Sequence, residues 1–185
     1  MAQDRRVART KAALTRALFE LLGEKGHEKI TITELAQRAD VDRKTFYLHY
    51  HSVEEILEDF YEDALCRLQA DLEREKVFGR EIDMAGFFRV LSGVMAKDMP
   101  LYRRLAAGSG YTYFMERLRT LLKSALEDAL RRKGEEDEIQ IRMSAEVYAA
   151  GVMRAYREWL SGSLDLGEEE FAARIGRMVC KGLDL

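Results

Sequence analysis

Residues 31–57 read TITELAQRADVDRKTFYLHYHSVEEIL, and this stretch decides the fold. Thr31 is followed three residues later by a glutamate, which forms a capping box and predicts the start of a helix. Asp40 tolerates a left-handed backbone, so it predicts a tight turn after that helix. Asp42 can cap a second helix that runs to about residue 49. The stretch therefore predicts two short helices joined by a turn.

This arrangement is the one that lets a first helix cross the DNA backbone while the second enters the major groove. The second helix carries guanidinium, ammonium, hydroxyl and imidazole groups that suit base edges and phosphates. Its candidate DNA-binding residues are Arg43, Lys44, Thr45, Tyr47, Leu48 and His49. The residues expected to pack inward are Leu35, Val41, Phe46 and Tyr50. The alternative is a plain helical hairpin with a solvated polar face.

Helical periodicity continues on both sides of this stretch. A first helix is expected over about residues 4–24, and Ser52 opens a long helix to about residue 75 with a second capping box. The single proline, Pro100, is acceptable in a helix's first turn. Further helices are expected at about 84–97, from a restart at Pro100, at 111–134 with its end at Gly134, at 136–160 and at 168–182. The chain is expected to be all-α.

The composition favours a packed chain with an uneven charge. Hydrophobic residues make up 47% of the 185 residues and charged residues 34%, which argues against disorder. Residues 1–50 hold 10 Lys and Arg against 7 Asp and Glu, a net +3. The remainder holds 20 against 26, a net −6. A basic head on an acidic body suits a protein that presents one end to a polyanion, although ordinary surface variation gives the same numbers.

Several classes of protein are not expected. The two cysteines lie far apart and form no CxxC pair, which favours a reducing cytoplasm. No secretory leader and no run of about eighteen apolar residues is present, so we expect a cytoplasmic protein without a membrane span. His49 and His51 are two residues apart on a helix and point to different sides, which disfavours a metal site. No catalytic constellation or phosphate loop appears, so neither an enzyme nor a cofactor is expected.

Residues 31–57 strongly resemble the DNA-binding domain of the TetR family of bacterial transcriptional regulators. That family shows a helix like ELAQRA, a short turn, and a recognition helix of the form T-[LF]-Y-x-H-[FY], here TFYLHY at 45–50. The preceding RRVARTKAALTRALFELLGEKG, residues 5–26, looks like the family's first helix. The resemblance covers roughly residues 4–58, and the number of expected helices supports it over the rest.

The resemblance assigns roles within the recognition helix. It implies that Thr45, Tyr47 and His49 contact the sugar-phosphate backbone or base edges. It also implies that Arg43 and Lys44, at the start of that helix, read bases.

Outside the recognition helix, the resemblance implies a phosphate contact from Thr31 and a basic arm formed by Arg5 and Arg6. Two positions depart from the family pattern. Asp40 stands where glycine is common, and Val53 stands where the family often has lysine after the fourth helix's cap. Because each phosphate contact adds about −0.9 to the salt slope, we expect DNA binding to be less salt-sensitive than in relatives with that lysine.

The resemblance implies an N-terminal three-helix DNA-binding domain with a helix-turn-helix, followed by a C-terminal helical bundle for ligand binding and dimerisation. The expected domains are a DNA-binding domain at 1–51, a connector helix at 52–75 and a regulatory and dimerisation domain at 76–185. The expected function is a repressor that binds a palindromic DNA operator as a homodimer and responds to a small-molecule effector. The alternative is a helical co-regulator that acts mainly through a protein partner, with weak or lost DNA binding. A helical enzyme ranks last.

In the family, the middle helices surround a pocket for a small inducer. The candidate pocket residues are Phe87, Phe88, Tyr102, Tyr111, Phe114 and Tyr148. Aromatic residues at helical spacing are usually core, so a plain packed core is the alternative for each of them.

The last two expected helices are candidates for a two-fold, four-helix interface, which the resemblance also implies. The helix at 136–160 is apolar on two sides and must be buried twice. Gly151 in its interior suggests close approach by another helix backbone. The candidate interface residues are Val147, Gly151, Ala155, Trp159, Phe171, Ile175, Met178 and Val179. In the alternative, both apolar stripes pack within one subunit.

Overall fold

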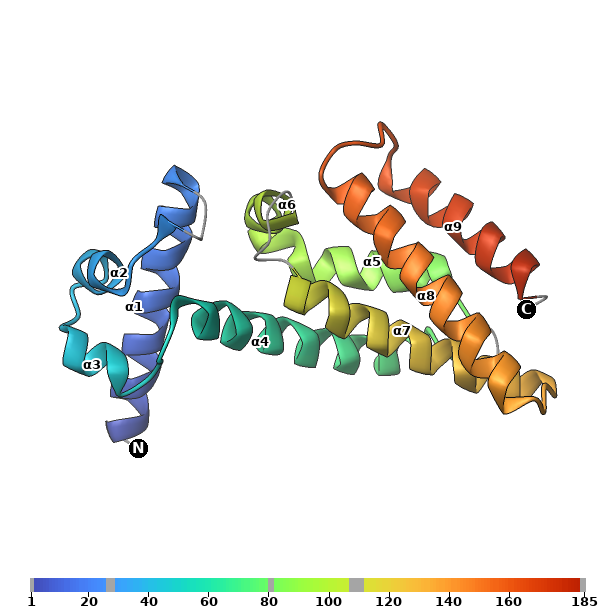
Figure 1. Cartoon of the computed structure of the whole chain (residues 1–185), viewed down its shortest axis with the longest axis horizontal. Helices are drawn as coiled ribbons and strands as arrows, with labels where there is room; N and C mark the ends of the chain where they lie inside the picture. The colour runs from blue at the N-terminus through green and yellow to red at the C-terminus, as the bar shows by residue number, and fades with distance from the viewer. Residues whose placement is uncertain (1, 26–28, 80–81, 107–111, 184–185) are drawn as a thin grey trace. The chain divides into compact units, whose positions relative to one another are not determined.

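The computed structural model describes residues 2–25, 29–79, 82–106 and 112–183, and within them the chain is built from helices (Figure 1). The only strand-like pairing among these residues is an isolated bridge between Phe78 and Ile82. The all-α prediction is confirmed. The helices are α1 (Ala2–Glu24), α2 (Ile32–Arg38), α3 (Arg43–Tyr47), α4 (Val53–Arg74), α5 (Met84–Met95), η2 (Ala96–Asp98), α6 (Met99–Ala106), α7 (Thr112–Lys133), α8 (Glu138–Leu160) and α9 (Glu168–Gly182).

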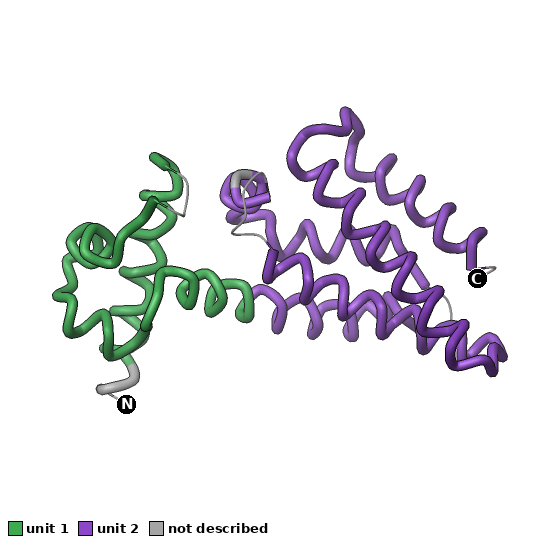
Figure 2. Tube along the Cα trace, viewed as in Figure 1, with its two compact units in different colours: residues 1–63 green, residues 64–185 purple. Residues whose placement is uncertain are grey.

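The chain divides into two compact units (Figure 2). Unit 1 is Met1–Asp63 and unit 2 is Ala64–Leu185, so the division falls within α4. None of the described helices combines the length and apolar character that crossing a bilayer requires.

Unit 1 packs α1 to the first part of α4 around one apolar core. Leu14, Leu18, Leu21 and Leu35 are buried from α1 and α2. Phe19 of α1 meets Phe60 of α4 edge to face, with ring centroids 4.7 Å apart. Small and aliphatic side chains at helical spacing in α1 therefore provide the surface against which α2 packs, and α3 packs in turn against α2.

An arginine clamps α2 to the end of α1. The two guanidinium nitrogens of Arg38 donate to the two carboxylate oxygens of Glu24 at 2.8 and 3.1 Å. This hydrogen-bonded guanidinium holds the pKa of Glu24 below its ordinary value. The paired, planar geometry fixes the direction of α2 more strongly than a single ion contact would.

Unit 2 is organised around packed aromatic rings. Phe88 of α5 lies 5.4 Å from Tyr156 of α8 and 5.1 Å from Phe171 of α9, measured between ring centroids. Trp159 stacks on Phe171 at 5.3 Å, and its indole donates to the carbonyl of Leu166 at 2.8 Å. These contacts tie three helices together across more than eighty residues of sequence.

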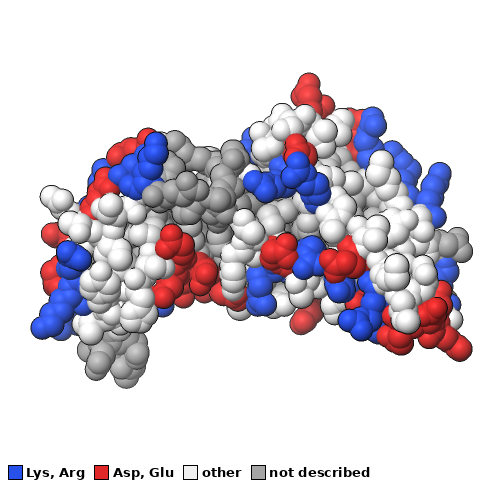
Figure 3. Space-filling model, viewed as in Figure 1, with Lys and Arg blue, Asp and Glu red and all other residues white. Residues whose placement is uncertain are grey.

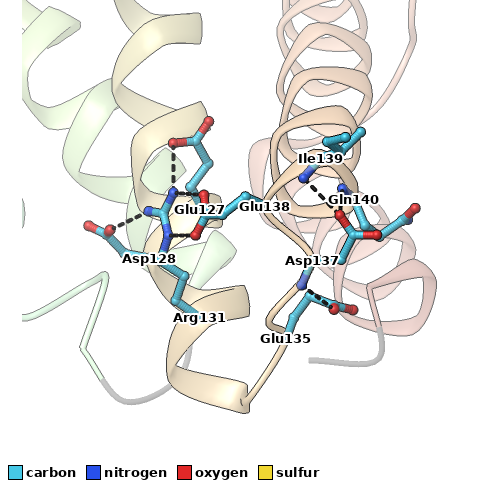
Figure 4. Close-up of polar contacts among 8 residues, drawn as sticks. All are labelled: Glu127, Asp128, Arg131, Glu135, Asp137, Glu138, Ile139 and Gln140. Atoms are coloured by element: carbon cyan, nitrogen blue, oxygen red, sulfur yellow. Dashed lines mark hydrogen bonds and ion pairs between the residues drawn. The ribbon is translucent and has the colours of Figure 1, made fainter.

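The turn between α7 and α8 is closed by polar contacts (Figure 4). Asp137 caps α8 by accepting from the backbone nitrogens of Ile139 and Gln140 at 2.9 and 3.1 Å. Arg131 in the last turn of α7 donates to both carboxylate oxygens of Glu138 at 3.1 and 2.9 Å. The acidic run at 134–138 therefore serves as the start of α8.

The helix boundaries follow the predictions closely, with two differences. The helix expected from Glu136 begins at Glu138, because Asp137 acts as its N-cap. The second helix of the helix-turn-helix ends at Tyr47, not near His49. Its C-cap, Leu48, donates both to Lys44 and to Thr45, so the last turn tightens and the helix stops.

Candidate nucleic-acid interface

The turn between α2 and α3 is a complete Schellman motif. Asp40 has a φ of 54°, in the left-handed region where glycine is common. Its backbone nitrogen donates to the carbonyl of Gln37 at 3.2 Å, and that of Val41 donates to Ala36 at 2.9 Å. Aspartate therefore adopts the backbone that the turn needs, and the departure from glycine does not disrupt it.

Asp42 starts α3 with two hydrogen bonds to one residue. Its carboxylate accepts from the backbone nitrogen of Thr45 at 2.9 Å and from the Thr45 hydroxyl at 2.8 Å. The backbone bond from Thr45, followed by the hydroxyl bond, lowers the pKa of Asp42. Because the Thr45 hydroxyl already donates to Asp42, it can donate to a phosphate only by leaving the cap.

The outer face of α3 is open to solvent. Arg43 and Lys44 are exposed, and neither has an ion-pair partner among the described residues. Tyr47 is 44% exposed and Leu48 is 76% exposed. Basic side chains also gather at the edge of unit 1 where α3 lies (Figures 1 and 3). The helix thus presents two free cations and two large, partly apolar side chains together.

The opposite face of α3 is locked into unit 1. Phe46 is fully buried, Tyr50 is 3% exposed, and Leu35 of α2 is fully buried beside them in the core. Val41, expected to be inward, is only half-buried, as are Thr45 and His49. The inward and outward sides of α3 otherwise follow the helical spacing of the sequence.

The outlying candidates are accessible but lie on other elements. Thr31 is exposed, and its hydroxyl caps α2 by accepting from the backbone nitrogen of Glu34 at 3.3 Å. Arg5 and Arg6 are exposed near the start of α1. Val53 is 5% exposed, so this position contributes to the core of the unit rather than to its outer surface.

A polar cluster beside α3 was missed by sequence reasoning. The hydroxyl of Tyr50 donates to Asp59 Oδ2 at 2.6 Å, and Lys11 Nζ donates to the same oxygen at 2.9 Å. Burial opposes ionisation of Asp59, but the bonds from Tyr50 and Lys11 leave its pKa lowered. Burial, reinforced by the carboxylate, raises the pKa of Tyr50, so the phenol remains the donor. The three residues come from separate elements, and no local motif marks them.

The second capping box also differs in detail from the sequence pattern. Ser52 accepts from the backbone nitrogen of Glu55 at 3.2 Å, as expected. The carboxylate of Glu55 accepts instead from the nitrogen of His51 at 2.7 Å, one residue before the cap.

Among the described residues, no group of three or more His, Cys, Asp or Glu side chains could hold a metal ion.

Comparison with known proteins finds a match for the segment that contains α2 and α3. Residues 14–60 match the family model described as bacterial regulatory proteins, tetR family. This segment of the chain is therefore similar to the tetR family of bacterial regulatory proteins. The match spans the end of α1, both helices of the helix-turn-helix and the start of α4, including Tyr50 and Asp59.

One curated relative matches part of the chain. The chain is 43% identical over 56 residues to the uncharacterized HTH-type transcriptional regulator YxbF of Bacillus subtilis (strain 168). The match covers 30% of the chain and only 15% of that relative's length, so the chain corresponds to a small part of that relative.

Solved structures match nearly the whole chain in fold. A TetR-family regulator from Syntrophomonas wolfei is 18% identical, covers 95% of each chain and gives a TM-score of 0.67. The dihydroxyacetone kinase operon activator DhaS is 14% identical over 95% of this chain and 96% of its own, with a TM-score of 0.61. The TetR-family repressor FadR of Thermus thermophilus, solved with lauroyl-CoA, is 20% identical over 93% and 94%, with a TM-score of 0.60.

The aromatic pocket candidates lie mainly in the core of unit 2. The exposed fractions of Phe87, Phe88, Tyr102 and Phe114 are all 1% or less. Tyr148 is half-buried, and Tyr111 lies outside the described residues. The hollow of about 410 Å³ in unit 2 has other walls, formed by Gln69, Leu72, Glu73, Lys76, Phe78, Gly79 and Leu121.

The dimer candidates separate into two groups. Phe171, Ile175 and Val179 are at least 92% buried within the subunit, so their stripe completes the subunit's own core. Val147 and Met178 are 67% and 66% exposed. Ala155 and Trp159 are half-buried.

Gly151 is exposed, and a side-chain carbon built there would meet nothing within 4 Å. None of the described helices of the same subunit approaches it closely, so the close approach expected from the sequence does not occur among these residues.

Proposed function

We propose that the chain is a homodimeric transcriptional regulator that binds a palindromic operator through α3 of each subunit. The observation that carries the proposal is the exposed face of α3, where Arg43, Lys44, Tyr47 and Leu48 point away from a rigidly anchored core. Free guanidinium and ammonium groups on a helix that follows a tight turn match major-groove reading. Two-fold symmetry places the two reading helices about 34–36 Å apart, or at a multiple of that spacing.

The operator can be found and the reading face tested in one experiment. A randomised duplex pool is selected with the full chain, and the affinity for the enriched sequence is compared with that of Arg43→Ala and Tyr47→Ala. Each variant should lose at least about tenfold in affinity with its helical circular dichroism unchanged. Arg132→Ala, which removes an exposed arginine of α7, is the matched control and should bind normally. Normal binding by Arg43→Ala and Tyr47→Ala would remove α3 as the reading element.

The dimer is proposed to form on the exposed stripe of α8 together with α9. Ile139, Met143 and Val147 follow one another at four-residue spacing on α8, and all three are more than 60% exposed. They border a groove of about 440 Å³ that also includes Lys123 and Glu146. An apolar stripe of this kind is typical of a helix that has a second packing partner.

Control by a small-molecule effector is proposed to act through the aromatic core of unit 2. Two hydroxyl groups there lack strong partners. Ser92 is 91% buried, and its hydroxyl makes no hydrogen bond among the described residues. In the part of the chain that the structure describes, the Tyr156 hydroxyl donates only to the sulfur of Met95, at 3.4 Å. A polar group on an otherwise apolar ligand would satisfy either hydroxyl better than the protein does.

Repression relieved by this effector is the proposed mode of control, since a ligand that binds one state better shifts the population toward it. A panel of apolar compounds that carry one hydroxyl or carboxyl group tests the proposal. A true effector should raise the melting temperature and release the operator, and Ser92→Ala should weaken both effects. Failure of every compound to do either would count against a ligand site in this core.

A further inference from the structure

Three elements of unit 1 meet at a single carboxylate oxygen, Asp59 Oδ2. It accepts from the hydroxyl of Tyr50 at 2.6 Å and from Lys11 Nζ at 2.9 Å. Lys11 Nζ also lies 5.1 Å from the centroid of the Tyr50 ring, within reach of a cation–π contact. Lys11 belongs to α1, Asp59 to α4, and Tyr50 to the segment that directly follows α3.

Tyr50 is rigidly connected to the recognition helix. Its backbone nitrogen donates to the carbonyl of Phe46 at 3.0 Å, and the two rings lie 6.3 Å apart between centroids. Phe46 is fully buried and Tyr50 is 3% exposed. A displacement of the Tyr50 ring therefore displaces α3 as well, because neither ring has free space in which to absorb it.

Few other contacts orient α3 relative to α4. Among the described residues, the Tyr50–Asp59 bond is the side-chain hydrogen bond that joins residues 43–50 to α4. The cap from Asp42 to Thr45 lies within the α3 segment itself and cannot orient it. Since α3 has only five residues, its direction depends on such anchors more than that of a long helix would.

We infer that Asp59 is a positioning residue for DNA reading: with Lys11, it holds Tyr50 and thereby fixes the orientation at which α3 meets base edges. This inference rests on the proposed function and adds to it a residue that touches no nucleic acid. Base contacts need hydrogen-bond geometry, whereas phosphate contacts tolerate small shifts of a flexible cation. Loss of the anchor should therefore weaken binding to the operator selectively.

The test compares two duplexes of equal length, the selected operator and a scrambled sequence. Tyr50→Phe keeps the packed ring and removes only the hydroxyl, and Asp59→Asn keeps the shape and removes the charge. Each should weaken operator binding about tenfold and scrambled-duplex binding less than twofold. The double variant should be no worse than the weaker-binding single variant, because both substitutions act on the same hydrogen bond. Tyr50→Phe removes its donor, and Asp59→Asn replaces the charged acceptor by a weaker amide oxygen.

Phe19→Leu provides the matched structural control. It weakens the contact between α1 and α4 at Phe60 but does not touch the Tyr50 cluster. Loss of folded protein alone lowers the apparent affinity for both duplexes by the same factor, so this variant should show a parallel decrease or none. A parallel decrease for Tyr50→Phe would assign Tyr50 a merely structural role and overturn the inference.

Amide hydrogen exchange tests the anchor without DNA. In Tyr50→Phe and Asp59→Asn, the amides of residues 46–50 should exchange about tenfold faster, while those of α2 remain unchanged. Unchanged exchange at residues 46–50 would overturn the inference. If no operator can be selected, the proposed function fails, and the exchange result still decides whether Asp59 anchors α3.

Discussion

At the scale of single residues, the most exposed large hydrophobic side chain among the described residues of unit 1 is the most informative. Leu48 is 76% exposed at the C-cap of α3, one helical turn beyond Lys44. A leucine that is exposed to water at this position adds little to the folding stability of the subunit, since it buries little apolar area. An apolar side chain on a helix in the major groove can contact the C5-methyl group of thymine, which distinguishes thymine from the other bases.

We predict that Leu48 reads a thymine methyl in each half-site. Replacing thymines one at a time by deoxyuridine removes only that methyl, and one position should weaken wild-type binding about fourfold, the value of one buried methyl group. In Leu48→Ala the same replacement should have no effect. The salt dependence of binding should be equal in both proteins, because no phosphate contact changes. A deoxyuridine scan that is identical for the two proteins would exclude this role.

At the scale of elements, local chemistry explains why the sequence predicts the helix starts so well. Thr31, Asp42 and Ser52 cap helices through residues three positions away, so each pattern is visible in the sequence. The bond between Tyr50 and Asp59 depends on how the loop before α4 closes, and nine residues separate the partners. A candidate DNA-reading helix can therefore be predicted from spacing, but its anchor cannot.

The sequence also cannot show which of two neighbouring helices covers an apolar helix face. Periodicity shows that α9 has an apolar face at Phe171, Ile175 and Val179 but not which helix covers it. In the structure, Phe171 packs against Phe88 of α5 in the same subunit. The apolar residues of α8 that remain uncovered, such as Val147, can be recognised only once this packing is known.

The turn between α2 and α3 gives a prediction about stability at the element scale. Asp40 has a φ of 54°, and this conformation costs most residues with a Cβ about 1 kcal/mol, but aspartate and asparagine less. Asp40→Asn and Asp40→Gly should each stay within about 0.5 kcal/mol of the wild type in urea denaturation. Asp40→Ala should lower the free energy of unfolding by about 1 kcal/mol. Equal stability of the alanine and asparagine variants would show that the turn, in solution, does not need the left-handed backbone.

At the scale of the whole molecule, the proposed DNA recognition and the proposed association of subunits should depend on each other. A five-residue helix offers few base contacts, so a single copy of unit 1 has a small area with which to bind. Two copies of unit 1 that are joined through a dimer interface bind two adjacent half-sites of the operator. Once the first copy is bound, the second binds its half-site at a high effective concentration. The exposed stripe on α8 is the surface that we propose joins them.

Val147→Glu should therefore separate the subunits and weaken operator binding together. Val147 is 67% exposed, so a carboxylate there leaves the subunit core intact but places a charge in the proposed interface. Sedimentation velocity should show monomers at micromolar concentration, and operator affinity should fall at least about a hundredfold. Leu164→Glu, at a 39% exposed leucine between α8 and α9, is the matched control and should remain dimeric.

If Val147→Glu stays dimeric with full affinity, subunits must associate through another surface. If it becomes monomeric yet binds the operator as tightly as the wild type, reading does not require two copies.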